Sequence, residues 1–363
     1  MKRLLYIIFL VLLFIPLFQK WTMLIPEKPL YGAFAVTEKP ELSASNWFNG
    51  SFQSAYEKHF NEKLGFHASF VRLRNTFLYD LFGETNAHVV FGKENYLYEQ
   101  DYIDAHYGTD YVGLDSLRRT AEAVRQLRDT LAAHGKTLVV FLAPSKADFF
   151  PEHLPDSSKK AETDSTNYKQ LSRMLKQREL PVIDYNYHYM SCKATSPYPL
   201  YSKYGIHWSY YGSMQATDSL MHYIADARNT EMPRVVTDNF KVQNKPDHSD
   251  YDLGNLLNLS HRLKGYPLCY PQWHWQQPED TAKMPRLLTI SDSYYWEMYF
   301  YGRFWYYNTT AYPESFDKET SVSSFNLKEE IEKADVIIIM STTPGLKTFS
   351  WGFVQNALNA YRK

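Results

Sequence analysis

Two short segments carry residues that could perform nucleophilic catalysis together. The first is an apolar run, Leu287 to Ile290, that ends in Ser291-Asp292-Ser293. A buried strand that ends in small polar residues presents a serine at an exposed turn, so Ser293 is the candidate nucleophile. A serine hydroxyl needs a neighbouring base to take its proton, and His207 in Gly205-Ile206-His207-Trp208 could be that base. The two segments together predict chemistry through a serine.

Four further residues are candidates to support this pair. Asp292 has a short side chain that can bond the local backbone and hold the turn. The backbone N–H of Ser293 or Tyr294 and the side chain of Arg303 are candidates for an oxyanion hole. Lys146 follows a predicted strand end, so it either faces the site or lies on the surface. The structural alternatives for the central pair are a helix-capping serine and a core histidine.

Several other stretches accompany the Ser-Asp-Ser turn and the His-Trp pair in a fixed order. They are Trp47 to Gly50, Val90 to Tyr98, Ala143 to Lys146, Phe150 to Pro155 and Asp250 to Gly254. Their order and spacing resemble the SGNH-hydrolase-like proteins of the alginate O-acetyltransferase type, which include a related group known as DHHW-like. The resemblance covers roughly residues 45 to 345.

This resemblance implies a particular reaction. Ser293 would take up an acetyl group as an acyl-enzyme, His207 would be the base, and a hydroxyl of a cell-surface or secreted polysaccharide would accept the acyl group. A membrane-bound O-acyltransferase partner would supply the acyl group, and no cofactor is implied. An acetylesterase would use the same residues in the hydrolytic direction. In the family's transferase branch, too, the histidine precedes the serine in the chain.

One position departs from the family pattern. The family has an aspartate two residues before the histidine, where it orients the imidazole, and Gly205 occupies that position here. Loss of the orienting carboxylate typically costs several orders of magnitude in rate in a serine triad. Another acid, such as Asp184 or Asp148, could replace it, and Gly205 itself could serve a turn that needs positive φ. The alternative is a catalytically inactive polysaccharide-binding or scaffold subunit.

The composition excludes some classes of function. The chain has 363 residues, 44% of them hydrophobic, and a net charge of −1, which leaves no electrostatic footprint for nucleic acid. The histidines and the two cysteines lack the spacing of a metal site, so we expect none. Cys192 and Cys269 could form a disulfide in an oxidising compartment, although the sequence does not show that they meet.

The N-terminus predicts export. Lys2 and Arg3 precede an apolar run from Leu4 to Phe18, which orients the segment with its start in the cytoplasm. We expect an anchor over residues 1–21 in the inner membrane, with the rest facing the periplasm. The alternative is a cleaved signal peptide, and a distant Ala33-Phe34-Ala35 is its only small-residue cleavage site.

Strands and helices alternate in the remainder of the chain. Helical spacing over residues 117–131, 167–177, 211–225 and 351–361 separates apolar strands at 137–142, 180–184, 287–290 and 336–340. This alternation predicts a three-layer α/β/α, flavodoxin-like domain with a mostly parallel sheet over residues 111–363. Residues 22–110 read as an extension with a helix at 66–82, and residues 236–285 read as a long irregular insertion over the site.

Overall fold

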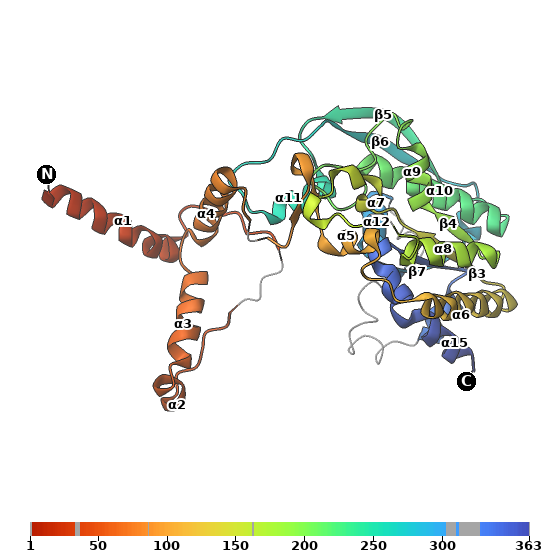
Figure 1. Ribbon diagram of the computed structural model, residues 1–363, viewed down its shortest axis with the longest axis horizontal. Helices are drawn as coiled ribbons and strands as arrows, with labels where there is room; N and C mark the ends of the chain where they lie inside the picture. The colour runs from red at the N-terminus through yellow and green to blue at the C-terminus, as the bar shows by residue number, and fades with distance from the viewer. Residues whose placement is uncertain are drawn as a thin grey trace. The chain divides into compact units, whose positions relative to one another are not determined.

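A computed structural model describes residues 2–32, 37–85, 87–161, 163–302, 310–311 and 327–362. The candidate Arg303 and the possible cleavage site Ala33-Phe34-Ala35 lie outside the described residues. The chain divides into two compact units (Figure 1). One comprises Met1–His88 with Gly254–Leu263, and the other comprises Val89–Leu253 with Lys264–Lys363.

The larger unit is built on a parallel sheet with the strand order β4-β3-β9-β7-β8. The strands are β3 (Thr137–Leu142), β4 (Val182–Asp184), β7 (Leu287–Ser291), β8 (Thr310–Ala311) and β9 (Val336–Ser341), and all four pairings are parallel. The three central strands are almost wholly buried because helices cover both faces, which explains their continuous apolar runs. The predicted α/β class is confirmed.

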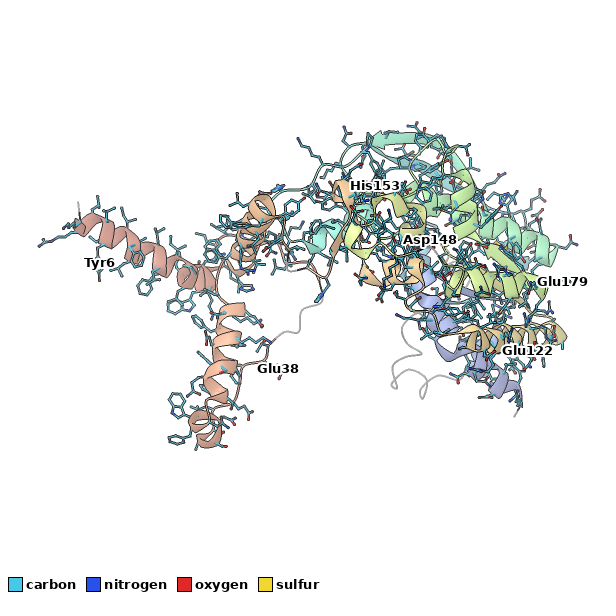
Figure 2. All side chains as sticks on the ribbon, in the orientation of Figure 1. Tyr6, Glu38, Glu122, Asp148, His153 and Glu179 are labelled. Carbon is cyan, nitrogen blue, oxygen red and sulfur yellow. The ribbon has the colours of Figure 1, made fainter. Side chains whose placement is uncertain are left out.

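Alternate residues of β3 enter different layers. Leu138, Val140 and Leu142 pack with α6 (Leu114–Ala133), α8 (Asn167–Gln177) and α15 (Phe353–Arg362). Phe141 stacks in the opposite direction on Tyr185 of α9 (Tyr185–Cys192). Helix α6 buries one stripe at helical spacing and keeps charged residues such as Glu122, paired with Arg125, at the surface (Figure 2).

The carboxyl ends of the strands lie at one edge of the sheet, because the strands are parallel. Short segments follow them there: α7 (Lys146–Phe149) after β3, α9 after β4, α12 (Ser293–Gly302) after β7 and η8 (Thr343–Gly352) after β9. Sites in open parallel sheets form outside this edge. Helix α10 (Tyr210–Arg228) begins just after the His-Trp pair.

The insertion is more regular than predicted. Strands β5 (Arg234–Gln243) and β6 (Leu268–Gln276) form an antiparallel pair, and η4 (His248–Tyr251) and α11 (Asp252–Leu256) lie between them in sequence. Much of this pair is exposed and polar, so its residues show little hydrophobic alternation, and the cross-strand pairing stabilises it instead. The prediction of an irregular segment was wrong for these two strands.

The helices in the described part of the smaller unit include α1 (Lys2–Thr22), α2 (Ala44–Phe48), α3 (Ser51–Glu62) and α4 (His67–Phe82). By length and composition α1 could cross a membrane, and a signal sequence would meet the same criterion. Asn258 exchanges hydrogen bonds with the backbone of Tyr31, and Ser260 N–H donates to Thr76. These bonds hold the segment Gly254–Leu263 within this unit.

The remaining elements among the described residues are short. They are β1 (Val90–Phe91), η1 (Lys93–Asn95), β2 (Leu97–Tyr98), α5 (Gln100–Tyr107), η2 (Pro151–His153), η3 (Asp156–Ser158), η5 (Thr281–Lys283) and α14 (Leu327–Lys333). Strands β1 and β2 pair antiparallel. Cys192 and Cys269 are both free thiols.

Candidate active site

Ser293, His207 and a third residue, Asp252, form a continuous hydrogen-bonded chain. His207 Nε2 lies 2.9 Å from Ser293 Oγ, and His207 Nδ1 lies 2.6 Å from Asp252 Oδ2. With Nδ1–H donating to the carboxylate, Nε2 is left to accept the serine proton. Ser293 is exposed, whereas the side chain of His207 is only 13% exposed. The arrangement has the geometry of a serine triad.

Local sequence places each of the three side chains. Ser293 is the first residue of α12, directly after the buried strand β7. His207 precedes Trp208, whose buried ring packs on Phe141 of β3 and on Tyr294. Asp252 is the first residue of α11, within the insertion between β5 and β6.

Asp252 is the acid that sequence reasoning missed. Asp148 instead bonds His106 and Asn186. Asp184 bonds Lys176 and Tyr168, so neither of the two acids first considered contacts His207. The available signal was the stretch Asp250 to Gly254, which was expected over the site, although its acid was not assigned to the histidine.

Gly205 is required for space and not for an unusual φ. It is absent from the residues with positive φ, so the turn explanation was wrong. A Cβ placed on it would lie 2.6 Å from both Ser202 Oγ and the backbone oxygen of Ser249. The segment that leads to Asp252 therefore approaches the chain at Gly205 too closely for any side chain.

Buried polar groups hold the segment before His207 on both sides. Lys146 Nζ donates to Gly205 O at 2.6 Å, and Tyr294 Oη donates to Ile206 O at 2.6 Å. Ile206 N–H donates to Asp252 Oδ1 at 2.9 Å, so this carboxylate bonds both the imidazole and its backbone. The imidazole is thereby oriented before any substrate binds.

Lys146 is not a surface residue, and it contacts the segment that carries His207. Its side chain is fully buried, and Nζ also donates to Leu97 O at 2.8 Å and Lys203 O at 2.9 Å. Burial lowers the pKa of Lys146 to about 7, although the charges of Asp252 and Asp250 oppose that shift. Three carbonyls match the three N–H donors of an ammonium group. Nζ also lies over the rings of Tyr96 and Tyr98, at 5.9 and 5.3 Å from their centroids, so the surface alternative is wrong.

Asp292 and Tyr294 shape the turn that carries Ser293. Asp292 Oδ2 accepts from the backbone N–H and hydroxyl of Thr342, at 2.6 and 2.7 Å, and its Oδ1 accepts from Tyr294 N–H at 3.1 Å. These bonds join the turn after β7 to the turn after β9. Tyr294 N–H is therefore occupied, and the Ser293 N–H at the start of α12 remains the oxyanion candidate.

Acidic groups surround the imidazole. Burial lowers the pKa of His207, but the hydrogen bond and charge of Asp252 raise it, with smaller contributions from Glu297 and Asp292, to about 9. Burial also raises the pKa of Glu99, and the charge of Asp252 raises it further. The protonated imidazole, which forms when the serine attacks, is thus stabilised. Among the residues described, no three His, Cys, Asp or Glu side chains group to hold a metal.

Residues 89–288 match the domain family described as SGNH hydrolase-like domain, acetyltransferase AlgX. The match covers more than half of the chain and includes His207 and Asp252. The chain belongs to this family. Its parallel sheet and covering helices agree with the SGNH-like fold that the resemblance implied.

Two curated relatives share part of the AlgX-type domain. A probable alginate O-acetylase AlgJ from Pseudomonas syringae pv. tomato is 28% identical over 109 residues, which is 30% of this chain and 27% of that protein. The same protein from Pseudomonas fluorescens is 29% identical over 106 residues, 29% of this chain and 26% of that protein. The matched region thus spans about a quarter of each relative.

Solved structures also share similarity with this AlgX-type chain. The O-acetyltransferase domain of Pseudomonas putida AlgJ is 15% identical, with 75% of this chain and 99% of that chain covered and a TM-score of 0.47. Pseudomonas aeruginosa AlgX is 14% identical, with 74% and 66% covered and a TM-score of 0.46. Bacillus cereus PatB1 is 12% identical, with 74% and 100% covered and a TM-score of 0.46.

Proposed function

We propose that this protein is an exported, membrane-anchored O-acyltransferase, or an acetylesterase, that acts on a cell-surface or secreted polysaccharide. The observation that carries the proposal is the continuous chain from Ser293 Oγ through the imidazole of His207 to Asp252. The names of the AlgJ relatives, probable alginate O-acetylases, support acetyl as the transferred group and a polysaccharide as the acceptor.

In the first step Ser293 Oγ attacks the carbonyl carbon of an acetyl donor. His207 Nε2 accepts the serine proton, and Asp252 stabilises the imidazolium that results. The carbonyl oxygen becomes an oxyanion, which the Ser293 N–H and the positive N-terminal end of α12 would stabilise. The tetrahedral intermediate then loses the donor alcohol, which takes the proton from His207, and acetyl-Ser293 remains.

In the second step an acceptor hydroxyl attacks the acetyl-enzyme. His207 accepts the hydroxyl proton, the bond between Ser293 Oγ and the acetyl carbon breaks, and the serine recovers the proton. A sugar hydroxyl as acceptor completes a transfer, and water as acceptor completes an ester hydrolysis. The ratio of transfer to hydrolysis depends on how well the site binds a glycan and excludes water.

The proposed location follows from the N-terminal segment. Helix α1 would be the anchor, over residues 1–21, with the extension (22–110) and the α/β/α domain (111–363) in the periplasm. Lys2 and Arg3 before the apolar residues favour that orientation. A membrane-bound O-acyltransferase would then supply acetyl groups to Ser293. A soluble form that begins after Ala35 would favour signal cleavage instead.

The inactive scaffold alternative depended on Gly205. Asp252 lies 2.6 Å from His207 Nδ1, where an orienting carboxylate is needed, although it comes from another part of the chain, so Gly205 no longer favours a scaffold. Both oxygens of Asp252 bond the His207 segment, and this supports a working triad over a scaffold. The enzyme is therefore the function that we propose.

The test uses the full chain in detergent with p-nitrophenyl acetate as donor. We expect turnover in the wild type, loss of turnover in Ser293→Ala, and an acetylated peptide that contains Ser293 after rapid quenching. Ser157→Ala is the matched control, because Ser157 is exposed and lies far from the triad in sequence. Turnover that survives in Ser293→Ala, or none in the wild type, would contradict the enzyme proposal.

A further inference from the structure

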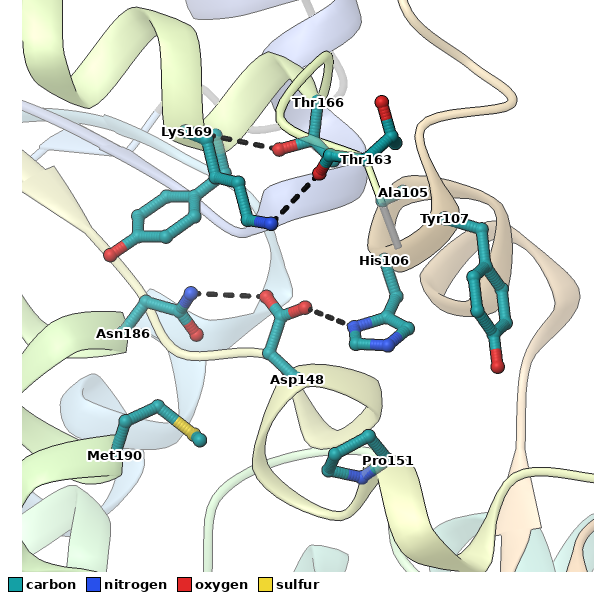
Figure 3. A pocket seen from close by; sticks show the side chains of 11 residues that line it. Ala105, His106, Tyr107, Asp148, Pro151, Thr163, Thr166, Lys169, Asn186 and Met190 are labelled. Carbon is teal, nitrogen blue, oxygen red and sulfur yellow. Dashed lines mark hydrogen bonds and ion pairs between the residues drawn. The ribbon is translucent and has the colours of Figure 1, made fainter. Parts of the chain in front are cut away.

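A cavity whose lining includes several polar side chains, but none of the triad, lies in the same unit as the triad. Its volume is about 270 Å³, and its walls come from α5, α7, α8 and α9 (Figure 3). His106, Asp148, Asn186 and Lys169 are grouped around it, and the mechanism above uses none of them. The cavity therefore needs an explanation of its own.

One wall of the cavity is a His-Asp pair without a nucleophile. Asp148 Oδ1 lies 2.7 Å from His106 Nδ1, and Asp148 Oδ2 accepts from Asn186 Nδ2 at 3.0 Å. Asn186 Oδ1 in turn accepts from the buried N–H of Ser145. Both carboxylate oxygens are thus bonded, and His106 Nε2 can accept a hydrogen bond from a ligand when the ring is neutral.

The facing wall supplies donors. Lys169 Nζ donates to Thr163 O at 2.8 Å, which leaves two N–H groups for a ligand. Lys169 lies in the first turn of α8, and its backbone N–H donates to the capping hydroxyl of Thr166. An acceptor on one wall and donors on the other match the hydroxyl groups of a sugar. Tyr107, edge-to-face with His106 at 4.8 Å, adds a ring to the lining.

The cavity and the nucleophile lie along one edge of the sheet. Asp148 follows β3 and Ser293 follows β7. Because β9 alone separates these two strands, the strands lie roughly 10 Å apart. Helix α5 gives a second estimate of how far the cavity lies from the nucleophile. Tyr102 stacks near Tyr294 with ring centroids 6.4 Å apart, and His106 is one turn further along, about 6 Å.

We propose that this cavity is a second glycan subsite, which holds one sugar residue of the acceptor chain while another residue presents its hydroxyl at Ser293. This inference rests on the proposed function. The subsite would favour long acceptors over short ones and would hold the polymer in place between successive transfers. It would have no effect on a donor that reacts with water.

Two variants test the subsite in the full chain. Lys169→Met removes the donor, and Met190→Trp fills the cavity from α9, where Met190 is exposed. Arg173→Met is the matched control, because it removes a cation from the same helix that pairs with Asp164 and does not line the cavity. Acceptors are hexasaccharides of glucose and of mannuronic acid, each compared with its monosaccharide, and p-nitrophenyl acetate is the donor.

With either hexasaccharide we expect KM to rise roughly tenfold in Lys169→Met, the effect of one hydrogen bond to a charged group. The monosaccharide KM and the hydrolysis of p-nitrophenyl acetate should stay at wild-type values, and Arg173→Met should match the wild type throughout. An unchanged hexasaccharide KM in both cavity variants would overturn the subsite, and so would equal losses for both acceptor lengths.

A binding measurement separates this inference from the proposed function. If wild-type protein shows no transfer, the proposed function fails, and saturation-transfer NMR with the same two hexasaccharides still tests the cavity. Binding to Ser293→Ala that is lost in Ser293→Ala/Met190→Trp supports the subsite. Equal binding by both proteins, or binding by neither, overturns it.

Discussion

Replacement of Asp252 by asparagine tests whether this carboxylate orients His207 for catalysis. Asp252→Asn keeps the size of the side chain, and its amide oxygen can still accept from Ile206 N–H. Its NH2 group would instead face His207 Nδ1, which lies 2.6 Å from the carboxylate in the wild type. The imidazole would then carry its proton on Nε2, and this tautomer cannot accept the proton of Ser293.

Two magnitudes follow from this change. The wrong tautomer in a serine triad lowers kcat by roughly 10⁴-fold, a value known from serine proteases. The rise in the pKa of His207 from 6.5 to about 9 corresponds to roughly 3 kcal/mol of preference for the imidazolium. Most of that preference depends on Asp252, so the pKa of His207 should fall in the variant.

The assay is the pH dependence of p-nitrophenyl acetate hydrolysis, corrected for hydrolysis without enzyme. The neutral imidazole is the base, so wild-type kcat/KM should rise with pH and level off above about 9. Asp184→Asn is the control, since Asp184 bonds Lys176 and Tyr168 instead of His207. Activity in Asp252→Asn within tenfold of the wild type would refute the assignment, as would a wild-type profile that is flat from pH 7 to 10.

Four other perturbations have defined outcomes. Gly205→Asp should lower both Tm and activity, because its Cβ would meet backbone at 2.6 Å; a wild-type Tm would contradict the packing argument. Lys146→Met leaves three buried carbonyls without a donor and should destabilise the fold by at least about 2 kcal/mol in urea unfolding. The stability that protonated His207 contributes is complete below its unfolded pKa and should be lost as pH rises through about 9, a trend that His207→Gln should lack. Deletion of residues 2–22 should release the protein from membranes without detergent, and a truncated form that stays bound would locate the anchor elsewhere.

The sequence by itself determined the elements that carry the site. The apolar runs of β3, β7 and β9 and the helical spacing of α6 and α8 identify a parallel α/β/α domain, because burial on both faces leaves a continuous apolar run. Ser293 at a strand end and His207 beside a tryptophan were chosen from these local patterns together with the resemblance to the SGNH-type family. Such patterns indicate which face of each element is buried, and they can be read from residues that are close together in the sequence.

Only the tertiary structure decided how the triad is completed. Asp252 is 45 positions from His207 in sequence, and the two meet because the insertion between β5 and β6 returns the chain to the sheet edge. The returning chain also explains Gly205, because the backbone at Ser249 comes so close that it leaves no room for a Cβ. Lys146 became a buried donor through other tertiary contacts, since its three carbonyl partners come from two distant segments. Contacts of this kind depend on how segments that are distant in sequence pack together, and residue type and spacing do not encode that packing locally.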